Sequence, residues 1–106
     1  MKTSLSNGAD VPWAPRYRYR GRMRVPELLL ITKKDCHLCA AARETVSEVA
    51  GRLGVPWRES LIDDDAGLRE RFADEVPVVM IDGVQRDFWT IDPVRLERKL
   101  RAAQQG

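Results

Sequence analysis

The sequence contains few cysteine and histidine residues, which stabilise many small proteins through disulfides or bound zinc. Its 106 residues include two cysteines and one histidine. Two cysteines cannot build a disulfide framework, and a closed zinc site needs four protein ligands, so here it would require carboxylates or a second subunit. A chain of this length suffices for one domain with its own apolar core, but not for two. We therefore expect a single globular domain.

Long apolar stretches are missing as well. The strongest aliphatic run is Leu-Leu-Leu-Ile at residues 28–31, far shorter than the roughly 20 residues that span a bilayer. The first residues also lack the apolar segment that is typical of a secretory signal. We expect a cytoplasmic protein without a membrane partner, and in that reducing compartment structural disulfides are rare.

Charge is distributed unevenly along the chain. Residues 1–24 contain six basic residues and one acidic residue, whereas the remainder contains twelve basic and fifteen acidic residues. This leading segment has no apolar periodicity, which predicts a flexible basic arm at 1–24 before a domain at 25–103. Alternating Arg and Tyr in the arm suit single-stranded nucleic acid, but a solvated tail or an added edge strand is favoured, so nucleic-acid binding is not expected.

Apolar patterning after the arm predicts alternating strands and helices. A short aliphatic run favours a buried strand, and apolar residues every three or four positions favour a helix. An Asp-Gly pair between apolar runs is typical of a hairpin turn, and Asp before Pro suits a helix start. The expected elements are a strand at 27–32, a helix ending at 51–54, a strand at 55–63, a helix at 64–73, strands at 76–81 and 84–90, and a helix from 92.

Both cysteines lie in the stretch TKKDCHLCAAARE, residues 32–44, with the histidine between them. Cys36 and Cys39 therefore stand where a strand gives way to a helix. A sulfur at the amino end of a helix meets unpaired backbone N–H groups and the positive end of the helix dipole, which favour the thiolate. We expect Cys36 to be the nucleophile that attacks a disulfide, and Cys39, one turn further on, to be the resolving thiol that releases the product.

The order β-α-β-α-β-β-α with this motif resembles the glutaredoxin branch of the thioredoxin fold. The resemblance covers residues 26 to about 102, and it is carried by Lys33, the Cys36–Cys39 motif, Val76-Pro77 and Asp82-Gly83. It implies an α/β domain with a four-stranded mixed sheet flanked by helices. It also implies a cis proline at Pro77 that faces the dithiol.

The resemblance also implies a substrate site. Lys33 would receive a substrate carboxylate, typically that of glutathione, and the backbone of Val76 beside Pro77 would pair with an extended substrate. His37, when charged, could stabilise the thiolate and raise the reduction potential, or it could simply be solvated. The expected partners are a disulfide-containing protein or a low-molecular-weight thiol, and we expect a monomer.

The sequence departs from the family where glutathione would bind. Glutaredoxins have a Gly-Gly pair after the hairpin, but this chain has Phe88-Trp89, whose bulk blocks the close backbone approach. Asp87 or Asp92 is a candidate for the amine partner of glutathione. We therefore expect no bound cofactor and keep glutathione as a candidate reductant beside a thioredoxin reductase system. Trp89 and Trp57 are candidates for the core or for a substrate groove, and the core is favoured.

Two other functions compete with a dithiol-disulfide oxidoreductase. The first is a module that binds a metal, or an iron-sulfur cluster bridged between two chains, through Cys36, Cys39 and His37. The second is an interaction domain with an idle dithiol. We predict no mononuclear metal site, because the chain has no further cysteine or histidine.

Overall fold

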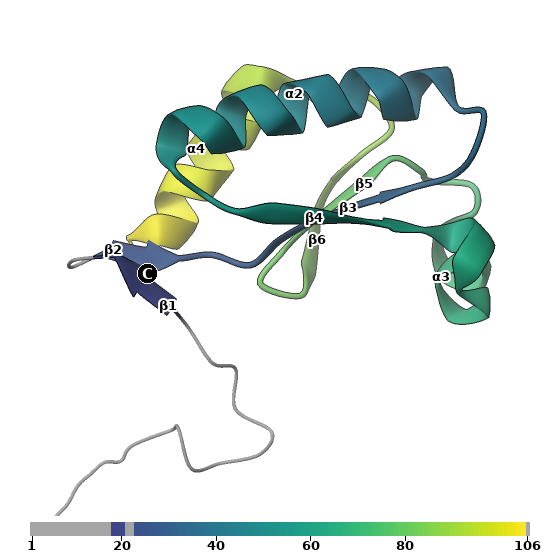
Figure 1. The fold of residues 1–106 in the computed structure, drawn as a ribbon, viewed down its shortest axis with the longest axis horizontal. Coiled ribbons are helices and arrows are strands. Elements are labelled where there is room, and N and C mark those ends of the chain that lie inside the picture. The colour runs from purple at the N-terminus through teal and green to yellow at the C-terminus, as the bar shows by residue number, and fades with distance from the viewer. Residues whose placement is uncertain (1–17, 21–22, 106) are drawn as a thin grey trace, which may run out of the picture.

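The computed structural model describes residues 18–20 and 23–105, and its main body is one mixed sheet with helices on both faces (Figure 1). The elements follow the predicted order, confirming the thioredoxin-like fold. After a short hairpin of β1 (Arg18–Arg20) and β2 (Met23–Val25), they are β3 (Leu28–Thr32), α2 (His37–Leu53), β4 (Trp57–Leu61), the 3-10 turn η2 (Ile62–Asp64), α3 (Ala66–Phe72), β5 (Val78–Ile81), β6 (Val84–Phe88) and α4 (Pro93–Gln104).

The main sheet has the strand order β4-β3-β5-β6. β3 runs parallel to β4 and antiparallel to β5, and β5 pairs antiparallel with β6. The turn between β5 and β6 has positive φ at both Asp82 and Gly83, the conformation that makes Asp-Gly a favoured hairpin pair. The register shifts by one residue between Val79 and Met80, where β6 carries an extra residue at Arg86.

Helices α2 and α4 begin and end at residues that suit those positions. Cys36 is the N-cap of α2, and Gly54 ends the helix in the left-handed conformation that glycine adopts most easily. Asp92 caps α4 by accepting a bond from the Arg95 N–H, with Pro93 at the first helical position. No helix among the described residues has the length and apolar character needed to cross a membrane.

Apolar side chains form two clusters, one on each face of the sheet. Alternate residues of β3 divide between them: Leu28 and Leu30 face α2 and α4, whereas Ile31 faces the side that carries α3. This period of two is what a strand buried on both faces requires. The second cluster contains Cys39, and Cys36 packs against it, so the dithiol is joined to the core.

The end of the basic segment that the structure describes forms a short hairpin. β1 and β2 pair antiparallel in a sheet of their own, so Arg24 lies in a strand. Its guanidinium donates to the Ala103 carbonyl at 3.0 Å and to the Asp82 carboxylate at 2.7 Å. The other residues of the predicted arm lie outside the described part of the chain.

Candidate redox site

The dithiol lies at the end of β3, where residues 33–36 connect the strand to α2. Asp35 has a φ of 54°, a left-handed conformation that aspartate tolerates better than most residues. The chain then enters α2 with Cys36 at the N-cap, and the Ala40 N–H donates to the Cys36 carbonyl at 3.1 Å. The local sequence thus places one sulfur at the helix start.

Cys36 and Cys39 form a disulfide, with their Cα atoms 5.2 Å apart. The two sulfurs differ in environment, because Cys39 is 1% exposed and Cys36 is partly exposed. The backbone N–H of Cys39 donates to the sulfur of Cys36 at 3.1 Å. The exposed sulfur therefore already accepts a bond from a helix amide, and such a bond favours a thiolate after reduction.

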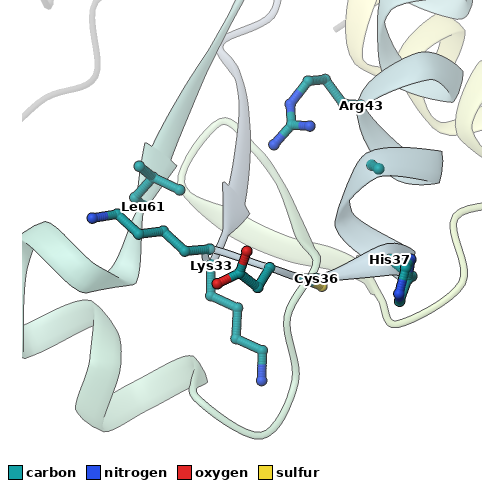
Figure 2. Close-up of a pocket in the computed structure, with 8 residues that line it drawn as sticks. Lys33, Cys36, His37, Arg43 and Leu61 are labelled. Carbon is teal, nitrogen blue, oxygen red and sulfur yellow. The ribbon is translucent and has the colours of Figure 1, made fainter.

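An open cleft of about 590 Å³ borders Cys36. Lys33 and His37, two of the predicted site residues, both line it. In the view of Figure 2, the His37 ring lies on the opposite side of Cys36 from Leu61. The lining also includes Lys34, Asp35, Ala40 and Arg43, so three of its side chains carry positive charge and one carries negative charge.

A polar network beside this cleft was not found from the sequence. Arg43 donates two hydrogen bonds to Glu59, at 2.8 and 2.7 Å, and the buried Thr32 hydroxyl donates to the same carboxylate at 2.5 Å. The bonds from Arg43 are the largest cause of the lowered pKa of Glu59. Because Glu59 lies on β4 and Thr32 on β3, only the strand pairing brings these residues together.

The Val76–Pro77 peptide bond is cis, as the resemblance implied. Val76 is buried in the apolar cluster that contains Cys39, so Pro77 and its neighbour lie at the dithiol end of the sheet. The Val76 N–H donates to the Phe72 carbonyl at 3.1 Å. Of the two backbone groups expected to pair with a substrate, the N–H is thus already bonded within the chain.

Trp89 occupies an unexpected position. It is 53% exposed, so the prediction that it belongs to the core is wrong, whereas Trp57 is partly buried against the core as predicted. The backbone of Trp89 has a φ of 64°, and the Trp89 N–H donates to the Pro77 carbonyl at 2.8 Å. The turn after β6 therefore directs the ring outward, an orientation that hydrophobicity alone does not indicate.

The two carboxylates considered for the amine of glutathione already have partners. Asp87 is 8% exposed and accepts two bonds from Arg95, at 2.8 and 3.0 Å. Asp92 accepts the N-capping bond of α4. In residues 18–20 and 23–105, no three His, Cys, Asp or Glu side chains are grouped so that they could hold a metal ion.

Comparison with known proteins identifies the family. Residues 27–101 match the model of the glutaredoxin-like domain family (DUF836). The chain belongs to this family. An uncharacterized protein of Mycobacterium tuberculosis (strain ATCC 25618 / H37Rv) is 33% identical to it over 79 residues, which cover 70% of this chain and 81% of the relative.

Solved structures agree with this assignment. A structural-genomics target protein from X. campestris is 33% identical, with a TM-score of 0.62 over 72% of this chain and 97% of the other. A thioredoxin from Halobacterium salinarum NRC-1 matches with a TM-score of 0.61 over 76% and 75% of the two chains, and at 16% identity it shows the fold alone. A cysteine pair at disulfide distance in this glutaredoxin-like fold supports a redox function.

Proposed function

We propose that the protein is a thiol-disulfide oxidoreductase with Cys36 as nucleophile and Cys39 as resolving thiol. The observation that carries this proposal is the asymmetry of the bonded pair. The partly exposed sulfur is the N-cap of α2 and accepts an amide bond, whereas the other sulfur is buried one turn further along the helix. Attack requires access and a thiolate, and Cys36 has the features that favour both.

The cycle exchanges one disulfide for another. The Cys36 thiolate attacks a sulfur of the substrate disulfide, forms a mixed disulfide and releases the second substrate sulfur as a thiolate, which takes a proton. Cys39, once deprotonated, attacks the Cys36 sulfur and displaces the first substrate sulfur. Two electrons pass to the substrate, and the Cys36–Cys39 disulfide is restored.

A reducing thiol must then return the pair to the dithiol form. We propose a low-molecular-weight thiol, with glutathione as a candidate, or the dithiol of a reductase. Because Asp87 and Asp92 are occupied by Arg95 and by the start of α4, neither supports an amine-binding role toward glutathione. A dedicated glutathione site thus has less support than a nonspecific thiol attack on the exposed Cys36 sulfur.

Lys33, His37, Val76 and Pro77 are assigned to substrate binding in this proposal. Lys33 and His37 line the cleft at Cys36, where cationic or hydrogen-bonding groups favour both a thiolate and an anionic substrate. Val76 and Pro77 immediately precede β5, and Val76 belongs to the apolar cluster that contains Cys39. In this proposal the Val76 carbonyl is the backbone group offered to an extended substrate.

The test measures reduction of bis(2-hydroxyethyl) disulfide by the full chain, with a reducing thiol in excess. Cys36→Ser should lower the rate by at least about 100-fold, because no other described cysteine has an exposed sulfur. Cys39→Ser should accumulate a mixed disulfide at Cys36 that mass spectrometry detects. Full activity of Cys36→Ser, with folding verified by circular dichroism, would overturn the assignment.

A further inference from the structure

Three large apolar side chains remain exposed near the dithiol. Leu38, between the two cysteines, is 48% exposed, while Phe88 and Trp89 are 44% and 53% exposed. The sheet register places them at the same end of the molecule: Phe88 pairs with Val78, and Val78 pairs with Ile31, one residue before β3 ends. Exposed apolar side chains at one end of a molecule mark interaction surfaces more often than scattered single residues do.

The aromatic part of this surface is held in place by the fold. The Trp89 N–H is bonded to the Pro77 carbonyl, and its indole N–H donates to the Asp74 carbonyl at 2.9 Å. The Phe88 and Trp89 rings contact edge to face, with centroids 5.0 Å apart. The indole thus has its polar group satisfied within the chain and presents apolar ring surface to solvent, as a preorganised binding side chain does.

The cleft at Cys36 is lined mainly by charged rather than apolar side chains. Within the described part of the chain, the ammonium groups of Lys33 and Lys34 have no carboxylate partner. The charge of Arg43 is offset by Glu59, and Asp35 is the one acidic side chain in the lining. The partly exposed Cys36 therefore lies in a cleft with the two lysine ammonium groups, at the same end of the sheet as Phe88 and Trp89.

We propose that the preferred substrate is the disulfide of an extended polypeptide that carries an aromatic or aliphatic side chain and an acidic side chain close to its cysteine. The apolar side chain packs on Leu38, Phe88 and Trp89, and the carboxylate lies at Lys33 and Lys34. This inference rests on the proposed function, and the exchange reaction is the one described above. Two attachment points of different chemistry also fix the direction of the bound chain.

The experiment uses the reduced full-length chain carrying Cys39→Ser, which retains the mixed disulfide. Each probe is a disulfide with 2-mercaptoethanol: a peptide with Glu and Phe flanking its cysteine in either order, a matched peptide with Lys and Ser, and glutathione. Bis(2-hydroxyethyl) disulfide is the neutral reference. Rates of modification at Cys36 are measured by acid quenching and mass spectrometry and are expressed relative to the reference.

Because the direction of the bound chain is fixed, one order of Glu and Phe should react faster than the other. The faster Glu/Phe peptide should react roughly tenfold faster than the Lys/Ser peptide, and faster than the glutathione probe, at low salt. Trp89→Gly, which keeps the positive φ available, and Leu38→Ser, at an exposed helical position, should each reduce this ratio several-fold. The matched control Val94→Ala alters a side chain that is 71% exposed on α4 and should leave the ratio unchanged.

A second set of variants tests the contribution of the lysine side chains in the cleft. The double substitution Lys33→Ala with Lys34→Ala should reduce the rate ratio of the Glu/Phe peptide to the Lys/Ser peptide several-fold and remove its dependence on salt, whereas Arg98→Ala, an exposed charge on α4, should preserve both. Equal relative rates for all probes, or a preference for glutathione, would overturn this inference while leaving the oxidoreductase intact. Failure to react even with the neutral reference would overturn the proposed function itself.

Discussion

At the end of the sheet where β3 begins, charged side chains are paired, whereas at the end where β3 leads to the dithiol several are not. Arg24 contacts Asp82 at 2.7 Å near the first end. Glu97 on α4 accepts a bond from Arg52, which connects α2 to α4, and a second bond from Arg101 within α4. These contacts join the hairpin and two helices into one unit.

The dithiol end instead exposes groups that a purely structural region would cover. Lys33 and Lys34 lie in an open cleft, and Leu38 and Trp89 are each about half exposed. Apolar and charged groups left without partners contribute little to folding, but they remain available to a ligand. In the function proposed above, substrate recognition belongs to the dithiol end, whereas the ion pair of Arg24 and the bond between α2 and α4 lie toward the other end.

The largest expected effect is on the free energy of unfolding, through the core at the end of the sheet where β3 begins, which we call the packed end. Leu100→Ala removes a side chain that is 0% exposed in the cluster beneath α4, and it should lower the free energy of unfolding by about 2–5 kcal/mol. Urea denaturation followed by circular dichroism measures this loss. Val94→Ala on the same helix should stay within about 0.5 kcal/mol, and equal losses in the two variants would contradict the assigned core.

The second expected effect is a difference in pKa and alkylation rate between the two thiols. After reduction, the Cys36 thiol should have a pKa below the value of about 8.5 for an ordinary cysteine, because its sulfur caps α2 and accepts the Cys39 N–H. Iodoacetamide alkylation rates across pH, followed by peptide mapping, measure this value. Cys39 should react much more slowly because it is buried. A Cys36 pKa equal to that of a free cysteine would instead favour an idle dithiol.

A smaller effect should follow from the ion pair at the packed end. Asp82→Asn keeps a residue type that tolerates positive φ but removes the charge opposite Arg24. We expect a loss of about 1 kcal/mol in unfolding free energy, since the pair is largely shielded from solvent. Reduction of the neutral disulfide should be unaffected. A large change in activity without a stability change would contradict the separation between the two ends.

The smallest effect is a pH dependence at Glu59. The bonds from Arg43 lower the pKa of this carboxyl in the folded chain. Its stabilising contribution is thus complete above the unfolded pKa of about 4.3 and is lost as the pH falls through the lower folded value. Glu59→Gln should cost up to about 1 kcal/mol at neutral pH, and urea denaturation should show this difference shrinking in acid.

Local sequence signals predicted most of the fold and the redox pair. Cys36 begins a helix, Asp82-Gly83 forms the hairpin turn, and Asp92-Pro93 starts α4, because each depends on backbone preferences of adjacent residues. The same reasoning located Cys39 one helical turn after Cys36. Such features need no knowledge of distant parts of the chain.

The features that were missed depend on distant contacts. Arg24 belongs to an ordered hairpin through Ala103 and Asp82, more than 50 residues away in the sequence. The Arg43–Glu59 bonds connect a helix to a strand, and the outward direction of Trp89 follows from its bond to Pro77. None of these contacts leaves a periodic pattern in the sequence.

The extra residue at Arg86 changes how β6 pairs with β5 partway along the strand. Gln85 pairs with Met80 before it and Asp87 pairs with Val79 after it, so Arg86 has no counterpart in β5. An inserted residue of this kind bends its strand and increases the local twist. Deleting Arg86 would therefore make the ladder regular while leaving Asp87 and Phe88 opposite the same residues of β5, so the bulge sets the curvature of this edge strand rather than its partners.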